Sequence, residues 1–462
     1  LERAGEGPRG PHRGPHLLTL AERAALVVTE DATWATLRRW TDRVADAVST
    51  PLLLVDAACV YPSRLVPGKV ADRAFKFRKA VEREWEVRIA AGWQEAAVPG
   101  ALAEDFDLPF EPLDFTDDEG GRLDAEAWNA RAAAWIAACR IDHGVPPIPG
   151  TPGGSRAGYA RWTAFRDGGL RGYARRRNDA LDDGVSRMSP YLHYGMVSPF
   201  RIAREAQARG GDGASKFLDE LLVWREMAHV WCFHTAEIET LGALPDWARA
   251  TLDSHRDDPR AAVYDRETLA RGKTGDRLWD AAQTSLLVHG ELHNNLRMTW
   301  GKVMVPWAPT PERALAQLVD LNHRYALDGR DPNCYGGLVW CRGLFDRPFP
   351  AGEPVTGQLR SRSTAIHAKR LDVARYVRGV ERAGVDHPPR VAVVGAGVAG
   401  LTCARTLADH RLPVVVFEKS RGLGGRLATR RTEHGAFDHG APGFTVEDAR
   451  FGRHVEAWAE RG

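Results

Sequence analysis

The chain has 462 residues, of which 44% are hydrophobic and 27% are charged, and its formal net charge is +2. These values are typical of a soluble globular protein with two or three domains. No apolar run reaches the roughly 18 residues that a membrane span requires, and residues 1–16 lack the apolar core of a signal peptide. A membrane protein is therefore excluded and a cytoplasmic location is expected. Six scattered cysteines form no CxxC pair, so neither a disulfide framework nor a metal site is expected.

The beginning of the chain combines a polar tail with a short α/β pattern. Residues 1–18 are rich in Gly, Pro and Arg and are predicted to be disordered. Apolar runs at Ala24–Val28 and Pro51–Val55 flank a helical stretch, Thr33–Val48, an order typical of a parallel α/β unit. Two strands are too few for a stable sheet, so residues 19–150 are predicted to be a truncated α/β domain.

The middle of the chain is predicted to be a helical domain, residues 151–380. The Pro- and Gly-rich stretch Gly144–Ser155 reads as the linker that leads into it, and residues 381–389 read as a second linker. In the second half of this domain, apolar residues recur at the spacing of one helix face: Leu296, Trp300, Val303 and Trp307. Pro306 is expected near the end of that helix.

A second helix is predicted from Thr310, an N-cap followed by a proline at the first helical position, and it carries Asn322 at its inner end. Arg297, Asn322, Asp328 and Asp331 all fall among apolar positions in this region. Buried charges without partners are costly, so these side chains are expected to hold something polar. The alternative is an ordinary helical core with aromatic filler.

The last segment, residues 390–462, changes character. A strand, a helix and a second strand are predicted at Val391–Val394, Val398–His410 and Val414–Phe417. Gly395, Gly397 and Gly400 form GxGxxG between the first strand and the helix, and Glu418 closes the second strand. Such glycines allow a pyrophosphate to approach a helix N-terminus, and an acid in that place binds a ribose hydroxyl. A fortuitous turn is the alternative.

Two further motifs, RGLGGRLATRR (Arg421–Arg431) and FDHGAPGF (Phe437–Phe444), extend this pattern. Together they resemble the opening of the FAD-dependent amine oxidase and renalase-like family. Because only about 70 residues remain, the segment is interpreted as a partial Rossmann-like module that could bind a second FAD or NAD(P).

The central motifs carry a second resemblance. They occur in the order GLRGYARRRNDALDDGVSRMSPYLHYGMVSP, FLDELLVWREMAHVWCFH, DRLWDAAQ, HNNLRMTWGKVMVPW and LNHRYALDGRDPN. From about residue 24 to residue 378 the chain resembles class II cyclobutane pyrimidine dimer photolyases. The resemblance implies an α/β domain followed by an all-α FAD-binding domain, in a monomer that repairs UV-damaged DNA with light and reduced FAD. The first part of the family's α/β domain has no counterpart here, which leaves an antenna chromophore open.

The resemblance also implies the residues that hold FAD. The phosphates and the ribityl chain would be contacted by Tyr173, Val185, Ser186, Met188 and Ser189. The flavin and adenine would be lined by Arg297, Asp328, Gly329 and Asn333, with Asn322 facing flavin N5. An N-cap at Ser186 or Ser189 and a structural Asn322 are the alternatives.

For electron transfer, the family relays electrons to the flavin through tryptophans that match Trp300, Trp279 and Trp307. Trp300 would be the proximal residue and Trp279 the next. Trp307, seven residues from Trp300 on the same predicted helix face, would be an accessory. Core packing is the alternative for Trp307.

For the substrate, Glu220 would hydrogen-bond the dimer and Trp224 would pack against its bases. The other matching positions for the dimer or DNA are Asn178, Met298, Trp340, Asp346 and Arg347. Two residues depart from the family pattern. Phe349 stands where many relatives have Trp, and Cys334 stands where they often have Gly.

Two other functions remain open. The C-terminal module could act as an FAD-dependent oxidoreductase of the amine oxidase type, or the chain could be a cryptochrome-like blue-light sensor. Glu220, Met298 and Asn178 favour repair, because a sensor does not need an acid that contacts the dimer.

Overall fold

The computed structural model describes residues 16–91, 108, 116, 121, 123–139, 141–350, 352–382, 387–438, 440, 441 and 443–461. They belong to two compact units, one made of Leu1–Thr251, Asp328–Ala351 and Gln358–Arg360 and the other of Leu252–Leu327, Gly352–Gly357 and Ser361–Gly462. Disorder was predicted for residues 1–18. Of these, residues 1–15 lie outside the described residues and only residues 16–18 are described. Those three are helical and begin α1 (His16–Arg23), so for them the prediction is wrong. The domain boundaries drawn from the sequence stay a prediction.

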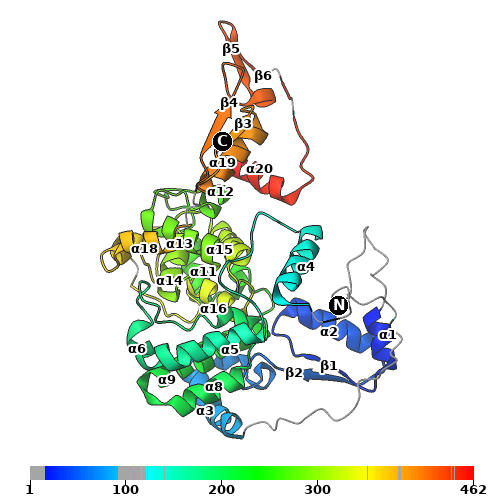
Figure 1. Cartoon of the computed structure of the whole chain (residues 1–462). Coiled ribbons are helices and arrows are strands. Elements are labelled where there is room, and N and C mark those ends of the chain that lie inside the picture. The colour runs from blue at the N-terminus through cyan, green and yellow to red at the C-terminus, as the bar shows by residue number, and fades with distance from the viewer. Residues whose placement is uncertain are drawn as a thin grey trace. The chain divides into compact units, whose positions relative to one another are not determined.

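The first unit contains the expected parallel α/β pattern. β1 (Val27–Glu30) and β2 (Leu52–Val55) pair in parallel, with Val27 opposite Leu52, and α2 (Ala35–Ala47) connects them (Figure 1). Along both strands half-buried and exposed residues alternate, which is the period of two of a strand covered on one face. The apolar runs therefore predicted the order of strand, helix and strand, although β1 begins three residues later than the run Ala24–Val28.

The rest of the first unit is helical. Its α-helices are α3 (Ala74–Ala91), α4 (Ala125–Ala138), α5 (Ser155–Ala164), α6 (Tyr173–Arg176), α7 (Ser189–His193), α8 (Pro199–Arg209), α9 (Gly211–Leu218), α10 (Glu226–His234) and α16 (Pro332–Trp340), while α11 (Asp246–Ser254) leads into the second unit. Shorter turns are η1 (Ser63–Leu65), η2 (Gly68–Val70), η4 (Leu170–Gly172) and η6 (Leu241–Ala243), and π-helical turns are η3 (Phe165–Gly169) and η5 (Asp219–Arg225).

Helix α10 forms the core of the first unit. Every residue from Glu226 to Phe233 is buried, and the helix packs against α16. The two helices approach closely because α16 has a glycine at the contact: a Cβ on Gly336 would lie 2.7 Å from the Cβ of Ala228. This packing fixes α16, which carries several of the candidate site residues.

The second unit contains a group of helices whose starts follow their capping residues. They are α12 (Arg266–Ala270), α13 (Arg277–His289), α14 (Asn294–Val303), α15 (Pro311–Tyr325), α17 (Thr364–Ala368) and α18 (Val373–Val380). The predicted N-cap is confirmed, because the Thr310 side chain accepts a hydrogen bond from the Arg313 N–H and Pro311 is the first residue of α15. Asp265 and Asp276 cap α12 and α13 in the same way.

One predicted helix is shorter than its periodicity suggested. α14 ends at Val303, so Trp307 lies beyond the helix and does not share a helical face with Trp300. Pro306 explains the difference, because proline has no N–H to donate to the carbonyl of Lys302 and disfavours helical geometry in the residue before it. The apolar spacing continues past the point at which the backbone leaves the helix.

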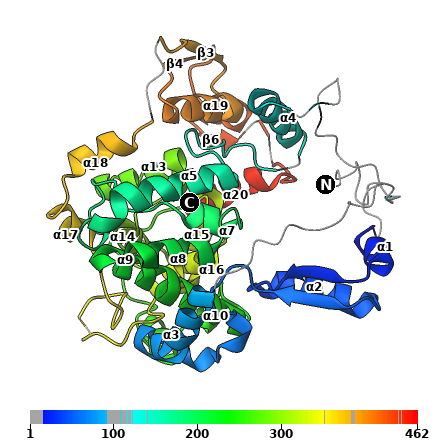
Figure 2. The same ribbon diagram turned by 60° about the horizontal axis from the view of Figure 1, so that its bottom comes forward.

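The C-terminal module within the second unit follows the predicted βαβ pattern. β3 (Val391–Val394) pairs in parallel with β4 (Val414–Phe417), and α19 (Val398–Asp409) connects them and packs against both (Figure 2). An antiparallel hairpin of β5 (Thr429–Thr432) and β6 (Gly435–Asp438) follows η7 (Gly425–Leu427), and α20 (Ala449–Arg461) ends the described chain. No helix in the described part of the chain is both long and apolar enough to cross a membrane.

Two glycines of the GxGxxG turn, Gly395 and Gly400, are required by their surroundings. Gly395 has a φ of 97°, and a Cβ on Gly400 would lie 1.9 Å from the Gly395 carbonyl oxygen. We therefore expect Gly400→Ala to destabilise the module by about 1–3 kcal/mol, because the added methyl group forces the turn away from α19. Hydrogen exchange of the β3 and β4 amides measures this loss. Gly422→Ala is the matched control, since a Cβ there meets no atom within 4 Å. Equal protection in both variants would contradict the expectation.

Candidate functional site

Glu220 lies in the first unit, on the π-helical turn η5 that continues α9. Its Oε1 atom is 2.7 Å from the guanidinium of Arg177 and 2.7 Å from the ammonium of Lys216. The same two groups stand near Tyr173, where burial, reinforced by the Glu220 charge, raises the pKa of the phenol. Glu220 is therefore held as one member of a charged cluster. The sequence interpretation missed Arg177 and Lys216, although Lys216 stands four residues before Glu220 on a helical face.

Two half-buried indole rings stack in the same unit. The centroids of Trp224 and Trp340 are 4.9 Å apart and their planes differ by 13°. Phe345 meets the edge of Trp340 at 6.0 Å, in a backbone conformation with a φ of 64° that non-glycine residues rarely adopt. The sequence named both tryptophans as substrate positions without linking them. Of the neighbouring pair, Asp346 is buried and Arg347 is exposed.

The residues assigned to the FAD phosphates and ribityl chain lie around the starts of α6 and α7. Tyr173 begins α6 and is buried, and Ser189 begins α7 next to the buried Met188. The intervening loop is fixed by Arg161, which donates hydrogen bonds to the carbonyl of Ser186 at 2.9 Å and to that of Val185 at 3.3 Å. This unit contains four more candidates. Asp328 and Gly329 are buried, and Asn333 is half-buried in the first turn of α16. Asn178 is exposed.

The second unit brings three predicted tryptophans together. Trp279 and Trp300 are fully buried and stack with centroids 6.1 Å apart at 12°, and Trp279 Nε1 donates to the Trp300 carbonyl at 3.0 Å. The ring of Trp307 meets that of Trp279 at 5.5 Å, although it lies outside the helix. Tyr264 continues the contact, with its ring 5.0 Å from Trp307. The sequence interpretation missed Tyr264, which no local pattern links to Trp307.

The other candidates of the second unit are Asn322, Arg297 and Met298. Asn322 is 1% exposed on α15, whose buried residues are apolar apart from Asn322 and Gln317. Arg297 and Met298 are half-buried and adjacent on α14. A buried amide of this kind suits the polar edge of a planar ring, because it can both donate and accept a hydrogen bond.

In the C-terminal module the acid after β4 faces the glycine turn. Glu418 Oε2 accepts from the Ala396 N–H at 2.6 Å, and its Oε1 accepts from the N–H and hydroxyl of Ser420 at 2.8 and 2.7 Å. The hydrogen bond from the Ser420 N–H, and to a smaller extent that from the Ala396 N–H, lower the pKa of Glu418 to about 2. Gly397 bridges to Gly424 of the second glycine motif. The GxGxxG turn and the second glycine motif, Arg421–Arg431, therefore lie next to each other.

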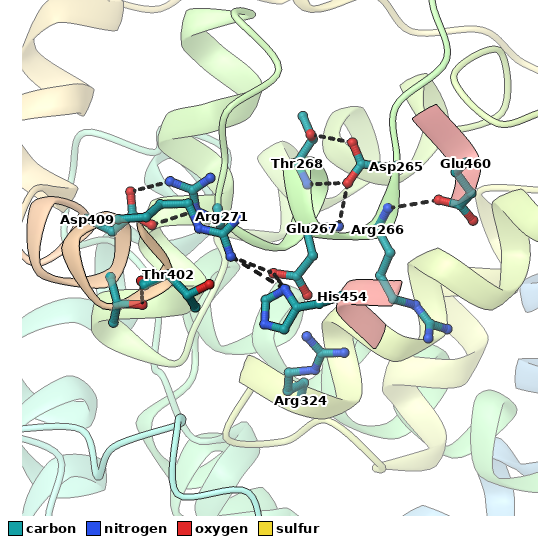
Figure 3. Close-up of polar contacts among 12 residues, drawn as sticks. Asp265, Arg266, Glu267, Thr268, Arg271, Arg324, Thr402, Asp409, His454 and Glu460 are labelled. Atoms are coloured by element: carbon teal, nitrogen blue, oxygen red, sulfur yellow. Dashed lines mark hydrogen bonds and ion pairs between the residues drawn. The ribbon is translucent and has the colours of Figure 1, made fainter. Parts of the chain in front are cut away.

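Ion pairs attach this module to helix α12 of the same unit (Figure 3). Arg271 donates to both carboxylate oxygens of Asp409 on α19, at 2.6 and 2.8 Å. Glu267 lies 3.3 Å from the imidazole of His454 on α20. Three more pairs extend this contact, Arg405 with Glu267, Arg266 with Glu456 and Arg313 with Glu460. Polar contacts between charged and titratable side chains therefore join the module to α12 and to the start of α15.

The Arg271–Asp409 pair offers a quantitative test of that attachment. A double-mutant cycle with Arg271→Ala and Asp409→Ala is expected to give a coupling of about 0.5–1 kcal/mol, the usual size for a partly exposed bidentate pair. The readout is the opening free energy of α12 from hydrogen exchange. The pair Arg450–Asp448 lies within α20 and its preceding turn and serves as control, with no expected effect on α12. A coupling of zero for Arg271 and Asp409 would refute the contact.

Comparison with solved structures decides the fold. The structure resembles a bacterial class III photolyase from Agrobacterium tumefaciens with a TM-score of 0.56 and 18% sequence identity, covering 79% of this chain and 70% of that one. It resembles a cryptochrome from Synechocystis with a TM-score of 0.53 and 16% identity, with the same coverage. The chain has the photolyase/cryptochrome fold.

Sequence comparison adds photolyase homologues over most of the chain. A deoxyribodipyrimidine photo-lyase of Methanothermobacter thermautotrophicus is 29% identical over 361 residues, which is 78% of this chain and 75% of the relative. One from Oryza sativa subsp. japonica is 32% identical over 353 residues, 74% of this chain and 65% of the relative. Residues 393–459 match a family described as an NAD(P)-binding Rossmann-like domain.

These findings confirm photolyase homology, the helix-rich photolyase/cryptochrome fold and a Rossmann-like C-terminal module. The class II assignment, the amine oxidase likeness and the individual site roles stay predictions. Among the residues that the structure describes, no group of three or more His, Cys, Asp or Glu side chains is arranged to hold a metal ion.

Proposed function

We propose that the chain repairs cyclobutane pyrimidine dimers in DNA under light, as a class II type of deoxyribodipyrimidine photo-lyase with FAD as cofactor. The observation that carries this proposal is the contact of Trp300, Trp279 and Trp307 in the second unit. A run of buried or half-buried indoles at 5.5–6.1 Å is suited to moving single electrons through the protein. Light-driven reduction of a bound oxidised flavin needs such a path, whereas hydrolysis and group transfer do not.

The residues present fit an FAD molecule by their chemistry. The buried amide of Asn322, the buried carboxylate of Asp328 and the hydroxyls of Ser186 and Ser189 offer donors and acceptors for a flavin ring and for a ribityl and phosphate chain. Tyr173, Val185, Met188, Arg297, Gly329 and Asn333 would complete the binding residues. When it is bound and reduced, FAD supplies a photoexcited electron that splits the cyclobutane ring and is then recovered.

The side chains of the first unit would hold the damaged bases. A dinucleotide taken out of the duplex could pack against the Trp224–Trp340 pair, since stacking on an indole is worth about 1–3 kcal/mol per base. Glu220 would accept a hydrogen bond from the dimer and position it, while Arg177 and Lys216 keep its carboxylate oriented. Asn178, Met298, Asp346 and Arg347 would contribute further contacts to the substrate or to DNA.

A second candidate is a cryptochrome-like light sensor, because the fold matches a cryptochrome nearly as well as a photolyase and a sensor would use the same tryptophans.

The C-terminal module would bind a separate dinucleotide, NAD(P) or a second FAD, through the glycine turn of Gly395, Gly397 and Gly400 and through Glu418. An oxidase of the amine oxidase type would need that module to act alone.

The test uses the purified full chain, thymine-dimer DNA and reduced FAD under near-UV or blue light. Loss of dimers in the light but not in the dark supports repair. Bound FAD with no loss of dimers favours the sensor, and peroxide production from an amine or from NAD(P)H in the dark favours the oxidase.

A further inference from the structure

A buried carboxylate outside the sites above is held between two histidines. Asp331 is 4% exposed and stands at the start of α16 in the first unit. Its Oδ2 lies 3.2 Å from Nδ1 of His193 on α7, and its Oδ1 lies 3.7 Å from Nε2 of His229 on α10. Residues of three helices that are distant in sequence, α7, α10 and α16, therefore meet at one charged group.

The same carboxylate shapes the chain on both sides of itself. Asp331 Oδ1 accepts the N–H of Asn333 at 2.8 Å and so caps α16. The Asp331 N–H donates to the carbonyl of Asp328 at 2.9 Å and closes the turn before the helix. Asp328, Gly329 and Asn333, the three FAD candidates of this segment, are thus all within three residues of the clamped side chain.

Capping alone does not require this arrangement. Ser, Thr or Asn caps a helix about as well as Asp and avoids burying a charge. Two histidines from other helices offset the desolvation of Asp331 and also restrict its direction, because each must meet a different oxygen. α16 carries Trp340 at its far end, so the clamp also fixes the helix that supports the Trp224–Trp340 stack.

The protonation states of the clamp follow from its neighbours. Burial, reinforced by the positive charge of Arg225, lowers the pKa of His229, so its ring is neutral near pH 7. Burial alone would raise the pKa of Asp331, but the hydrogen bond from His193 and the nearby ring of His229, 3.7 Å away, outweigh it and hold the pKa well below its usual range. A neutral His229 meets the carboxylate with an N–H only if Nε2 carries the proton, and Nδ1 then accepts from the Thr33 hydroxyl, 3.4 Å away.

We propose that Asp331, held by His193 and His229, is a positioning residue that sets the segment Asp328–Asn333 for FAD binding. This rests on the proposed function, because FAD is the ligand assigned to that segment. Loss of the clamp frees the turn before α16 and lets Asp328 and Asn333 leave their binding geometry, so FAD is released faster even though the chain remains folded.

The test measures FAD release from the purified full chain by the rise in flavin fluorescence on dilution. His229→Leu removes the ring nitrogens at nearly constant volume and is expected to speed release about tenfold, the effect of a loss of roughly 1.4 kcal/mol. His229→Gln can place an amide N–H against Asp331 and is expected to restore release to within about threefold of the parent. His234→Leu is the matched control, since His234 ends the same helix but bonds the Val66 carbonyl.

A pH profile separates positioning from packing. The folded pKa of His229 is depressed, so the unfolded chain takes up its proton first, and the stabilisation by neutral His229 is lost as the pH falls below about 6.5. Arg225, Asp56 and Asp331 act on the ring from the elements packed around it. FAD release from the parent chain is therefore expected to accelerate as the pH falls below about 6.5. This acceleration should be smaller in His229→Gln.

Three outcomes decide the matter. If His229→Leu melts at a lower temperature yet releases FAD at the parent rate, the clamp is structural only and the inference is wrong. If that variant does not fold, Thr33→Val replaces it, because it removes only the hydroxyl that faces Nδ1, and unchanged release in Thr33→Val would overturn the inference. If the parent chain itself binds no FAD, the proposed function fails first and the inference fails with it.

Discussion

Replacement of Glu220 by glutamine is expected to reduce light-driven dimer repair roughly a hundredfold, the size of effect that a small misplacement of the reacting group can have. The FAD content should not change, since Glu220 is not among the residues assigned to the cofactor. Glutamine keeps the size of the side chain and a hydrogen-bonding oxygen. It removes the charge that orients the group through Arg177 and Lys216. The measurement is the number of dimers repaired per photon absorbed by the reduced protein.

Asp219→Asn is the matched control for this prediction. Asp219 is adjacent to Glu220, pairs with the same Lys216 at 2.5 Å and also pairs with Arg78. A loss of repair in both variants would indicate that the local charge balance matters and that Glu220 has no special role. Repair at the parental yield in Glu220→Gln would remove the assignment entirely.

Replacement of Trp279 by phenylalanine is expected to slow light-driven reduction of bound oxidised FAD by at least about tenfold. Trp279 contacts both Trp300 and Trp307, so it is the one of these three residues through which the other two communicate. Phenylalanine fills most of the space but is much harder to oxidise than indole. Repair by protein that has been reduced chemically beforehand should be unaffected, because that route does not use the relay.

Two controls accompany Trp279→Phe. Trp128→Phe removes an indole on α4 that contacts Trp135 and none of the relay residues described, and it should leave photoreduction unchanged. A melting curve is needed as well, because Trp279→Phe also removes the hydrogen bond to the Trp300 carbonyl. Photoreduction at the parental rate in a folded Trp279→Phe protein would show that electrons reach the flavin by another path.

The parts of the fold that the sequence predicted are those set by local chemistry. β3 and β4 begin and end where the apolar runs do, and α15 begins at its Thr310 cap. Each of these depends on neighbouring residues only. Trp307 shows where such reasoning stops, since its spacing continued the helical period while Pro306 had already ended the helix.

The site was predicted less completely because its contacts join residues far apart in sequence. Arg177 and Glu220 are separated by 43 positions, and Asp331 and His193 by 138. Nothing in the composition of either segment indicates its partner. The stacking of Trp224 on Trp340 is of the same kind, because the sequence could nominate each ring but could not place the two together.

The attachment of the C-terminal module to α12 has a practical consequence for anyone handling the protein. Its carboxylate–guanidinium pairs are partly open to solvent, so dissolved ions compete for them once the screening distance approaches the ~10 Å reached at 0.1 M ionic strength. Concentrated salt should therefore loosen the module while the stacking of the buried Trp279 on the buried Trp300, which does not depend on charge, is left intact. Buffer strength thus becomes a reversible means of asking which properties of the protein depend on the contact between the module and α12.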